Sequence, residues 1–209
     1  MELDRARGVA GIVLAAGASR RMGRNKLLLE LEGESLLRRA VGRAEAAGLD
    51  PVLVVLGYQA DRTLQELAGL TCRSILNPDY AQGVNISLRA GIAAVPPQAK
   101  AAVILLGDMP LVTASMIATL VERFRESGAP LVVSEYAGVQ APPTLFDRSL
   151  LDEFLGMERE ACAKGLVRRH LSQALVVRWP ADGLTDLDQT DDYERLVARS
   201  AVGRHPDAT

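Results

Sequence analysis

The segment VAGIVLAAGASRRMGRNK, residues 9–26, decides the fold class of this chain. Its first seven residues are an unbroken run of apolar and small side chains, which predicts a strand buried on both faces. The remainder is rich in glycine and small residues and carries the basic side chains Arg21 and Lys26. Such a backbone can approach a ligand closely, and its N–H groups together with the two cations suit a triphosphate. The segment therefore predicts a strand followed by an anion-binding loop.

Similar apolar runs recur along the chain and alternate with stretches of helical spacing. Further strands are expected at residues 52–56, 72–76, 101–106, 131–134 and 174–179. Helices are expected at residues 36–47 (capped by Ser35), 60–68, 86–94, 113–126, 149–155, 160–171 and 191–199. This alternation predicts βαβ units and a mostly parallel sheet. We expect one Rossmann-like, three-layer α/β/α domain over residues 1–200 and a disordered tail at 201–209.

Composition excludes several classes of protein. The 209 residues include 24 Lys and Arg against 26 Asp and Glu, so the basic excess typical of nucleic-acid-binding proteins is missing. No run of about 18 apolar residues is present, and the N-terminal residues lack the pattern of a signal peptide. The two cysteines lie far apart, which fits a reducing compartment. We expect a cytoplasmic protein that binds neither nucleic acid nor membranes.

Three motifs resemble those of one enzyme family. LAAGASRRMGRNK, residues 14–26, is similar to the signature LAxGxSxRMGxxK of the nucleotidyltransferases that act on the molybdenum cofactor. NPDYAQGVNISLRAG, residues 77–91, resembles that family's NPxWxxGxxxSLxxG, and GDMP at residues 107–110 matches a third motif. The resemblance covers nearly the whole chain. It implies Mg²⁺-dependent transfer of a nucleoside monophosphate from an NTP to a phosphorylated small molecule, a molybdopterin-type cofactor, with release of pyrophosphate.

The resemblance also implies roles for particular residues. The nucleotide-binding candidates are Leu14, Ala15, Ala16, Gly17, Arg21, Lys26, Gly83 and Ser87, and the catalytic candidates are Arg21, Lys26 and Asp108. Gly83 and Ser87 match positions near the nucleobase. At the position of Ala16, cytidylyl-type members carry alanine and guanylyl-type members carry glycine. A methyl group there narrows the base pocket, so the resemblance favours CTP over GTP.

Two acidic positions are candidates for binding Mg²⁺, which prefers hard oxygen ligands. Asp108 follows the strand at residues 101–106 and is the first candidate, although Asp-x-Pro also suits a turn. The second is Asp188, which the resemblance favours over Asp186 in the late acidic segment. Asp191 and Asp192 are expected to stabilise the start of the last helix.

The region expected to bind the acceptor matches the family less well. Residues 138–146 preserve only an outline of its G-x-P-x-L-F stretch, and residues 156–165 lack the GD pair of its GDxGA-like loop. Arg168, Arg169 and His170 suit either an acceptor phosphate or a solvated helix end. Two alternatives therefore stay open. One is a glycosyltransferase or a sugar-phosphate nucleotidyltransferase, and the other is a non-catalytic module that binds a nucleotide or cofactor and delivers it to a receiving enzyme.

Overall fold

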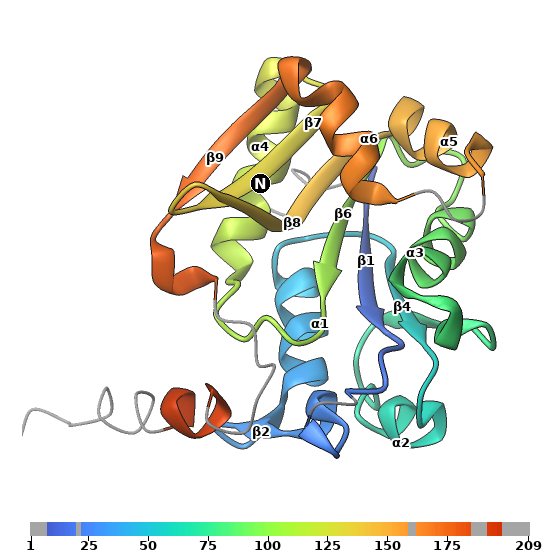
Figure 1. Cartoon of the computed structure of the whole chain (residues 1–209), viewed down its shortest axis with the longest axis vertical. Coiled ribbons are helices and arrows are strands. Elements are labelled where there is room, and N and C mark those ends of the chain that lie inside the picture. Colours follow the sequence, from blue (N-terminus) through green and yellow to red (C-terminus); the bar gives the residue numbers. More distant parts are fainter. Residues whose placement is uncertain (1–7, 20–21, 159–161, 185–191, 198–209) are drawn as a thin grey trace, which may run out of the picture.

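The computed structural model describes residues 8–19, 22–158, 162–184 and 192–197. A seven-stranded sheet runs through the molecule between helices and confirms the predicted α/β fold (Figure 1). Its strands lie in the order β5-β4-β1-β6-β8-β7-β9. They are β1 (Val9–Ala15), β4 (Val52–Leu56), β5 (Cys72–Leu76), β6 (Ala101–Leu106), β7 (Leu131–Tyr136), β8 (Val139–Asp147) and β9 (Ala174–Trp179).

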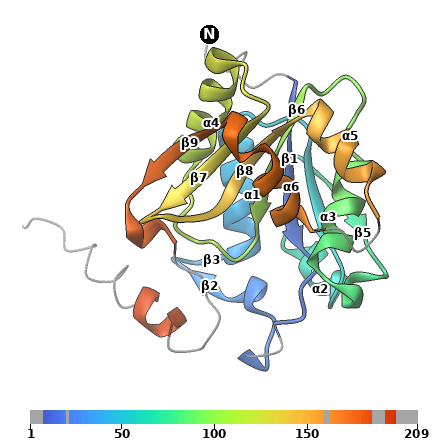
Figure 2. The ribbon, with the colours of Figure 1, turned by 45° about the horizontal axis from the view of Figure 1, so that its top comes forward.

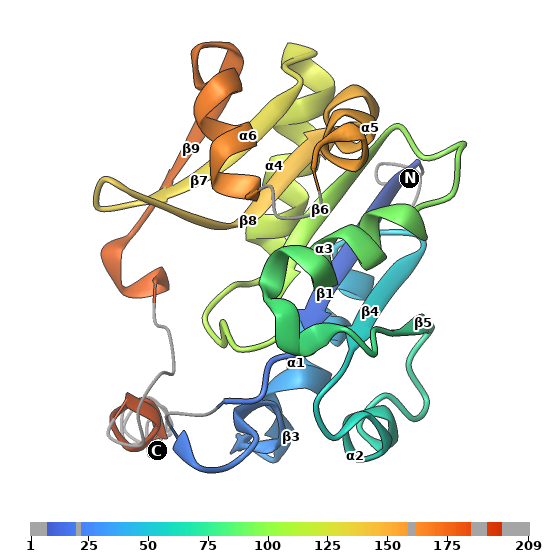
Figure 3. The same cartoon turned by 45° about the vertical axis from the view of Figure 1, so that its right-hand side comes forward.

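Helices cover both faces of this sheet. Helices α1 (Leu36–Ala46) and α4 (Ala114–Ser127) pack on one face, and α3 (Val84–Ala93), α5 (Arg148–Gly156) and α6 (Ala163–His170) on the other. Figure 3 shows the face that is covered by α3, α5 and α6. The short α2 (Ala60–Gln65) follows β4, and residues 192–197 are helical. Within the described ranges, no helix is long and apolar enough to cross a membrane.

The parallel part of the sheet is the part that the apolar runs predicted. β5, β4, β1 and β6 are parallel neighbours, and their boundaries agree with the predicted strands. Successive side chains of β1 point to opposite faces, so Val13 joins the core beneath α1 while Ile12 joins the core beneath α3. Both are fully buried, which explains why these strands read as unbroken apolar runs.

Helix α3 lies unusually close to the sheet because Gly91 has no side chain. A Cβ atom at this position would lie 2.6 Å from Cγ2 of Ile12 and 3.0 Å from Cγ2 of Val55. Any larger residue would therefore push the helix away from β1 and β4. Ser87 is four residues before Gly91 and lies on the same face of the helix. The height of Ser87 above the sheet thus depends on this close contact.

Strand β8 was not predicted. It lies between β6 and β7 and is antiparallel to both, whereas the sequence indicated only a loop after residue 134. Pro142 and Pro143 lack an N–H group, and the β7–β8 register shifts between Val133 and Ser134, opposite the two prolines. The Ser134 hydroxyl donates to the carbonyl of Pro143 at 2.7 Å, and the Tyr136 hydroxyl donates to that of Pro142 at 3.1 Å.

A small hairpin, β2 (Glu30–Leu31) and β3 (Glu34–Ser35), was also not predicted. The late helical residues 192–197 pack against it, because Leu196 belongs to the same apolar cluster as Leu31. The Tyr193 hydroxyl donates to the carbonyl of Glu30 at 2.6 Å. The last helix therefore returns to the loop that follows β1, as Figure 2 shows.

Candidate functional site

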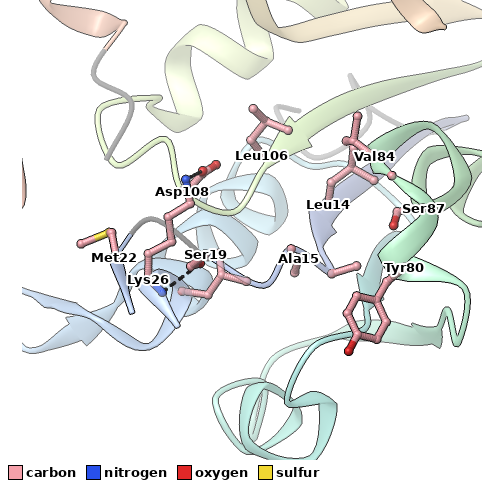
Figure 4. Close-up of a pocket in the computed structure, with 14 residues that line it drawn as sticks. Leu14, Ala15, Ser19, Met22, Lys26, Tyr80, Val84, Ser87, Leu106 and Asp108 are labelled. Carbon is pink, nitrogen blue, oxygen red and sulfur yellow. Dashed lines mark hydrogen bonds and ion pairs between the residues drawn. The ribbon is translucent and has the colours of Figure 1, made fainter. Parts of the chain in front are cut away.

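The carboxyl ends of β1 and β6 open onto a pocket of about 470 Å³, called here the first pocket (Figure 4). It brings together eight of the residues proposed from the sequence: Leu14, Ala15, Ala16, Gly17, Lys26, Gly83, Ser87 and Asp108. These residues come from the loop after β1, the start of α3 and the turn after β6. Two further candidates, Arg21 and Asp188, lie outside the described residues.

The charged centre of the first pocket is an ion pair between Lys26 and Asp108. Lys26 begins a 3-10 turn whose start is capped by Asn25, and its backbone N–H donates to the Ser19 hydroxyl at 3.2 Å. These contacts fix the position of the Lys26 backbone, from which its side chain extends to Asp108. Its side chain is 17% exposed and that of Asp108 is 16% exposed. The pair is therefore partly shielded from water, and an ion that binds either group must compete with the other.

The turn that carries Asp108 is held by a residue that sequence analysis did not single out. Arg43, on α1, donates to the backbone carbonyls of Pro110 and Val112. Burial, and secondarily the charge of Arg39, lower the pKa of the Arg43 guanidinium. Arg43 thus ties α1 to the turn after β6. No local motif indicates this role, because its partners lie more than 60 residues further along the chain.

The opposite wall of the first pocket is formed by the start of α3. Gly83 has φ 124°, a conformation that side chains disfavour, and it precedes the first turn of the helix. Ser87 is only 4% exposed, and it lines the pocket. Tyr80 also lines it, although it was not proposed as a site residue. The sequence could have indicated Tyr80 as a site residue, since it occupies the aromatic position of the NPxW motif.

A second pocket, of about 420 Å³, adjoins the first. The two share Leu14, Val84 and Leu106, so they meet above the ends of β1 and β6. Helices α3 and α6 and strand β8 line the second pocket, and most of its lining side chains are apolar. Two cationic residues, Lys164 and Arg168 on α6, also line it. Residues 140–146, expected to contact the acceptor, thus form part of its wall.

The basic cluster at the end of α6 divides into two groups. Of Arg168, Arg169 and His170, only Arg168 lines the second pocket. Arg169 and His170 both contact the carboxylate of Glu153 on α5, each at 2.8 Å. The hydrogen bond from Arg169 is the main reason why the pKa of Glu153 lies below its usual value. These two residues connect helices, and Arg168 remains the candidate for contact with a ligand.

The arrangement suits a cation that brings some of its own oxygen ligands. Asp108 is the one acidic residue among the described residues that line the first pocket. The described part of the chain also contains no cluster of three or more His, Cys, Asp or Glu residues that would enclose a metal. Mg²⁺ is commonly held by one or two carboxylates and by substrate phosphates. The pocket therefore fits Mg²⁺ that arrives with a nucleotide.

Known proteins are similar to this chain in sequence and in fold. The chain is 30% identical to the purine catabolism protein PucB of Bacillus subtilis over 89% of this chain and 94% of the relative. It is also 30% identical to the molybdenum cofactor cytidylyltransferase of Escherichia coli, over 67% and 70% of the two chains.

Solved structures of another protein are similar to this chain in fold. The structure of Rv0371c from Mycobacterium tuberculosis superposes with a TM-score of 0.81 at 28% identity, over 91% of this chain and 97% of the other. A manganese complex of the same protein superposes with a TM-score of 0.76 at 27% identity, over 91% and 98%. The MobA-like NTP transferase domain matches residues 11–174, which include all the described residues that line the two pockets. The chain belongs to the MobA-like NTP transferase family.

Proposed function

We propose that this nucleotidyltransferase moves CMP from CTP to the terminal phosphate of a molybdopterin-type cofactor in the cytoplasm. The observation that carries the proposal is the junction of the two pockets. Among the described residues, the first pocket is lined by one cation and one carboxylate, and it opens beside a mostly apolar pocket lined by two cations. An NTP in the first pocket and a phosphorylated acceptor in the second would meet at Leu14, Val84 and Leu106.

The first pocket suits the triphosphate. The Lys26 ammonium group is a point charge for phosphate oxygens, and the small residues after β1 allow close approach of the backbone. Asp108 would hold Mg²⁺, with Asp188 as the proposed second ligand. When bound there, the ion would neutralise phosphate charge that Lys26 alone leaves uncompensated. The manganese complex of the mycobacterial relative supports a divalent cation in this family.

The chemistry follows from this placement. An oxygen of the acceptor's terminal phosphate forms a bond to the α-phosphorus of the NTP, and the bond from that phosphorus to the bridging oxygen of pyrophosphate breaks. The attacking phosphate is already largely ionised near neutral pH, so no general base is required. Lys26, together with Arg21, would stabilise charge on the transferring and leaving phosphates. Lys164 and Arg168 would orient the acceptor phosphate.

The second pocket favours a planar heterocyclic acceptor over a sugar. Side chains such as Leu88, Ile104 and Phe146 offer apolar contact, whereas a sugar needs polar partners for its many hydroxyl groups. This supports a pterin-type acceptor. The product would then pass to a partner enzyme that receives the cofactor.

A pyrophosphate-release screen tests the proposal. CTP, GTP, ATP and UTP are each combined with purified molybdopterin cofactor and with a panel of sugar phosphates, with and without Mg²⁺. We expect release with CTP and the molybdopterin cofactor, dependent on Mg²⁺. Turnover with a sugar phosphate would assign the chain to sugar-nucleotide chemistry. Release of a nucleoside diphosphate would indicate glycosyl transfer, and binding without turnover would indicate a delivery module.

A further inference from the structure

Two buried polar side chains connect β5 to α3 beside the first pocket. Asn77 directly follows β5, and Ser87 lies in the first turns of α3. Each is only 4% exposed. The amide nitrogen of Asn77 donates to the Ser87 hydroxyl oxygen at 3.0 Å. A neutral, buried side-chain pair of this kind holds both groups in one orientation, because an unpaired polar atom there would cost free energy.

The direction of this hydrogen bond is fixed by the backbone. The Asp79 backbone N–H donates to the side-chain oxygen of Asn77 at 3.1 Å. A backbone N–H group can only donate, so the atom of the Asn77 amide that faces it must be the oxygen. The NH₂ group of Asn77 therefore faces Ser87, and the Ser87 hydroxyl must be the acceptor in their contact.

The consequence for Ser87 is that its own proton is available on the other side. A serine hydroxyl has one proton to donate and two lone pairs. Asn77 uses a lone pair, and the structure gives the hydroxyl no second hydrogen bond among the described residues. Ser87 also lines the first pocket, as Figure 4 shows. The Ser87 proton and one lone pair therefore remain for a ligand, so Ser87 can donate a hydrogen bond to it.

We propose that Asn77 is a positioning residue that keeps the proton of the Ser87 hydroxyl available for a hydrogen bond to the nucleobase. The inference rests on the proposed function, which places the base beside Gly83 and Ser87. It requires the base to present an acceptor at this point. Cytosine offers two adjacent acceptors, the O2 carbonyl and the unprotonated N3. The hydrogen bonds from Asp79 to Asn77 and from Asn77 to Ser87 thus keep the Ser87 proton available for one of these acceptors.

The Asn77→Asp substitution tests the inference, because it reverses the direction of the hydrogen bond between residues 77 and 87 while the side chain keeps nearly the same shape. In Asn77→Asp the side chain accepts from both the Asp79 N–H and the Ser87 hydroxyl, so Ser87 turns a lone pair towards the base. Binding of CTP and of inorganic tripolyphosphate is measured by calorimetry for the wild type, Asn77→Asp and Ser87→Ala. Tripolyphosphate carries the charge but no base, so the ratio of the two affinities removes any uniform effect of the new carboxylate.

We expect the ratio of CTP affinity to tripolyphosphate affinity to fall by about tenfold or more in both variants. An unchanged ratio in a folded Asn77→Asp protein would overturn the inference. If the wild type binds CTP no more tightly than tripolyphosphate, the proposed base site itself is wrong. If it prefers GTP, the proposed base preference is wrong, and the same ratio measured with GTP decides the role of Asn77.

A ligand-side experiment keeps the inference testable even if Asn77→Asp does not fold. Two analogues each remove or weaken one acceptor of cytosine: 3-deaza-CTP replaces N3 by C–H, and 2-thio-CTP replaces O2 by sulfur. One of them should bind the wild type about tenfold more weakly than CTP does, and the difference should disappear in Ser87→Ala. Equal binding of both analogues and CTP to the wild type would contradict a donor at Ser87.

Discussion

The two halves of the sheet present different surfaces to a ligand. On the side of β1, β4 and β6, parallel strands end at a pocket that contains the Lys26–Asp108 ion pair and whose residues lie in short, contiguous motifs. On the side of β7, β8 and β9, an antiparallel strand with two prolines forms one wall of a mostly apolar pocket. The first half carries the motifs that resemble those of the family. The second half resembles the family less, and it is where we propose that the acceptor binds.

The largest effect is expected at the first half. We expect Asp108→Asn to lower Mg²⁺-dependent pyrophosphate release by about 1,000-fold or more, because the amide keeps the shape but not the charge. Asp188→Asn should lower it less, since water can complete the shell of Mg²⁺. A magnesium titration of all variants measures this, with circular dichroism to confirm folding. Asp152→Asn, an exposed change on α5, is the control. Full activity in Asp108→Asn would refute the metal site.

Removing the cation of the same pair should have the next largest effect. Lys26→Ala is expected to lower kcat by at least about 100-fold, the scale of losing one aimed electrostatic donor. Thermal stability should change little, because Lys26 lies in a loop and its ion pair is partly exposed. Lys100→Ala, at the opposite end of β6, is the matched control and should retain wild-type kinetics. Steady-state kinetics that do not change in Lys26→Ala would exclude its role.

The second half should respond through the acceptor alone. The double variant Lys164→Ala/Arg168→Ala is expected to raise the KM for the acceptor by about 100-fold or more, since two charged contacts of roughly 1.5–3 kcal/mol each would be lost. The KM for CTP should stay the same. Arg169→Ala is the matched control, because Arg169 is next to Arg168 but pairs with Glu153. An equal rise of KM in the control would mean that the change acts through helix stability.

A smaller effect is expected for base preference. Ala16 is buried in the wall of the first pocket. Ala16→Gly should shift the ratio of kcat/KM for CTP and GTP towards GTP, but only partly, since one methyl group discriminates by about 1–3 kcal/mol. The Asn77–Ser87 hydrogen bond would remain in place. A wild-type enzyme that prefers GTP would show that the assignment to CTP is wrong.

The smallest effect concerns the stability of the antiparallel strand. Tyr136→Phe removes the hydrogen bond to Pro142 and should lower the free energy of unfolding by about 1 kcal/mol. Burial raises the pKa of Tyr136 to about 12, above the usual tyrosine value of about 10. The stabilisation by the neutral phenol is therefore present below the unfolded pKa and is lost as the pH rises towards the folded one.

Urea unfolding near neutral pH and at an alkaline pH between those two pKa values measures this loss. The wild type should lose more stability between the two conditions than Tyr136→Phe, which has no phenol to ionise. Identical losses in both proteins would show that other groups govern the alkaline response.

Sequence analysis predicted the first half well because its signals are local. A buried parallel strand is an unbroken apolar run, and the residues proposed for the phosphates and base occupy two short motifs. Strand β8 escaped prediction because Pro142 and Pro143 argue against a strand. The structure places them at a shift of the β7–β8 register, where their carbonyls accept hydrogen bonds from Ser134 and Tyr136. Arg43 and Asn77 escaped because their roles depend on contacts with distant segments or on hydrogen-bond direction. The Mg²⁺ ligands and the acceptor stay predictions.

The tight packing of α3 at Gly91 has a genetic consequence. Gly91 touches no ligand pocket, yet a side chain there would lift the helix and move Ser87 away from the base. In a library of random variants selected for loss of function in cells, substitutions of Gly91 should therefore be recovered together with those of the pocket residues. Such alleles would resemble active-site lesions, and suppressors should arise at Ile12 or Val55, where a smaller side chain would restore the room that the helix needs.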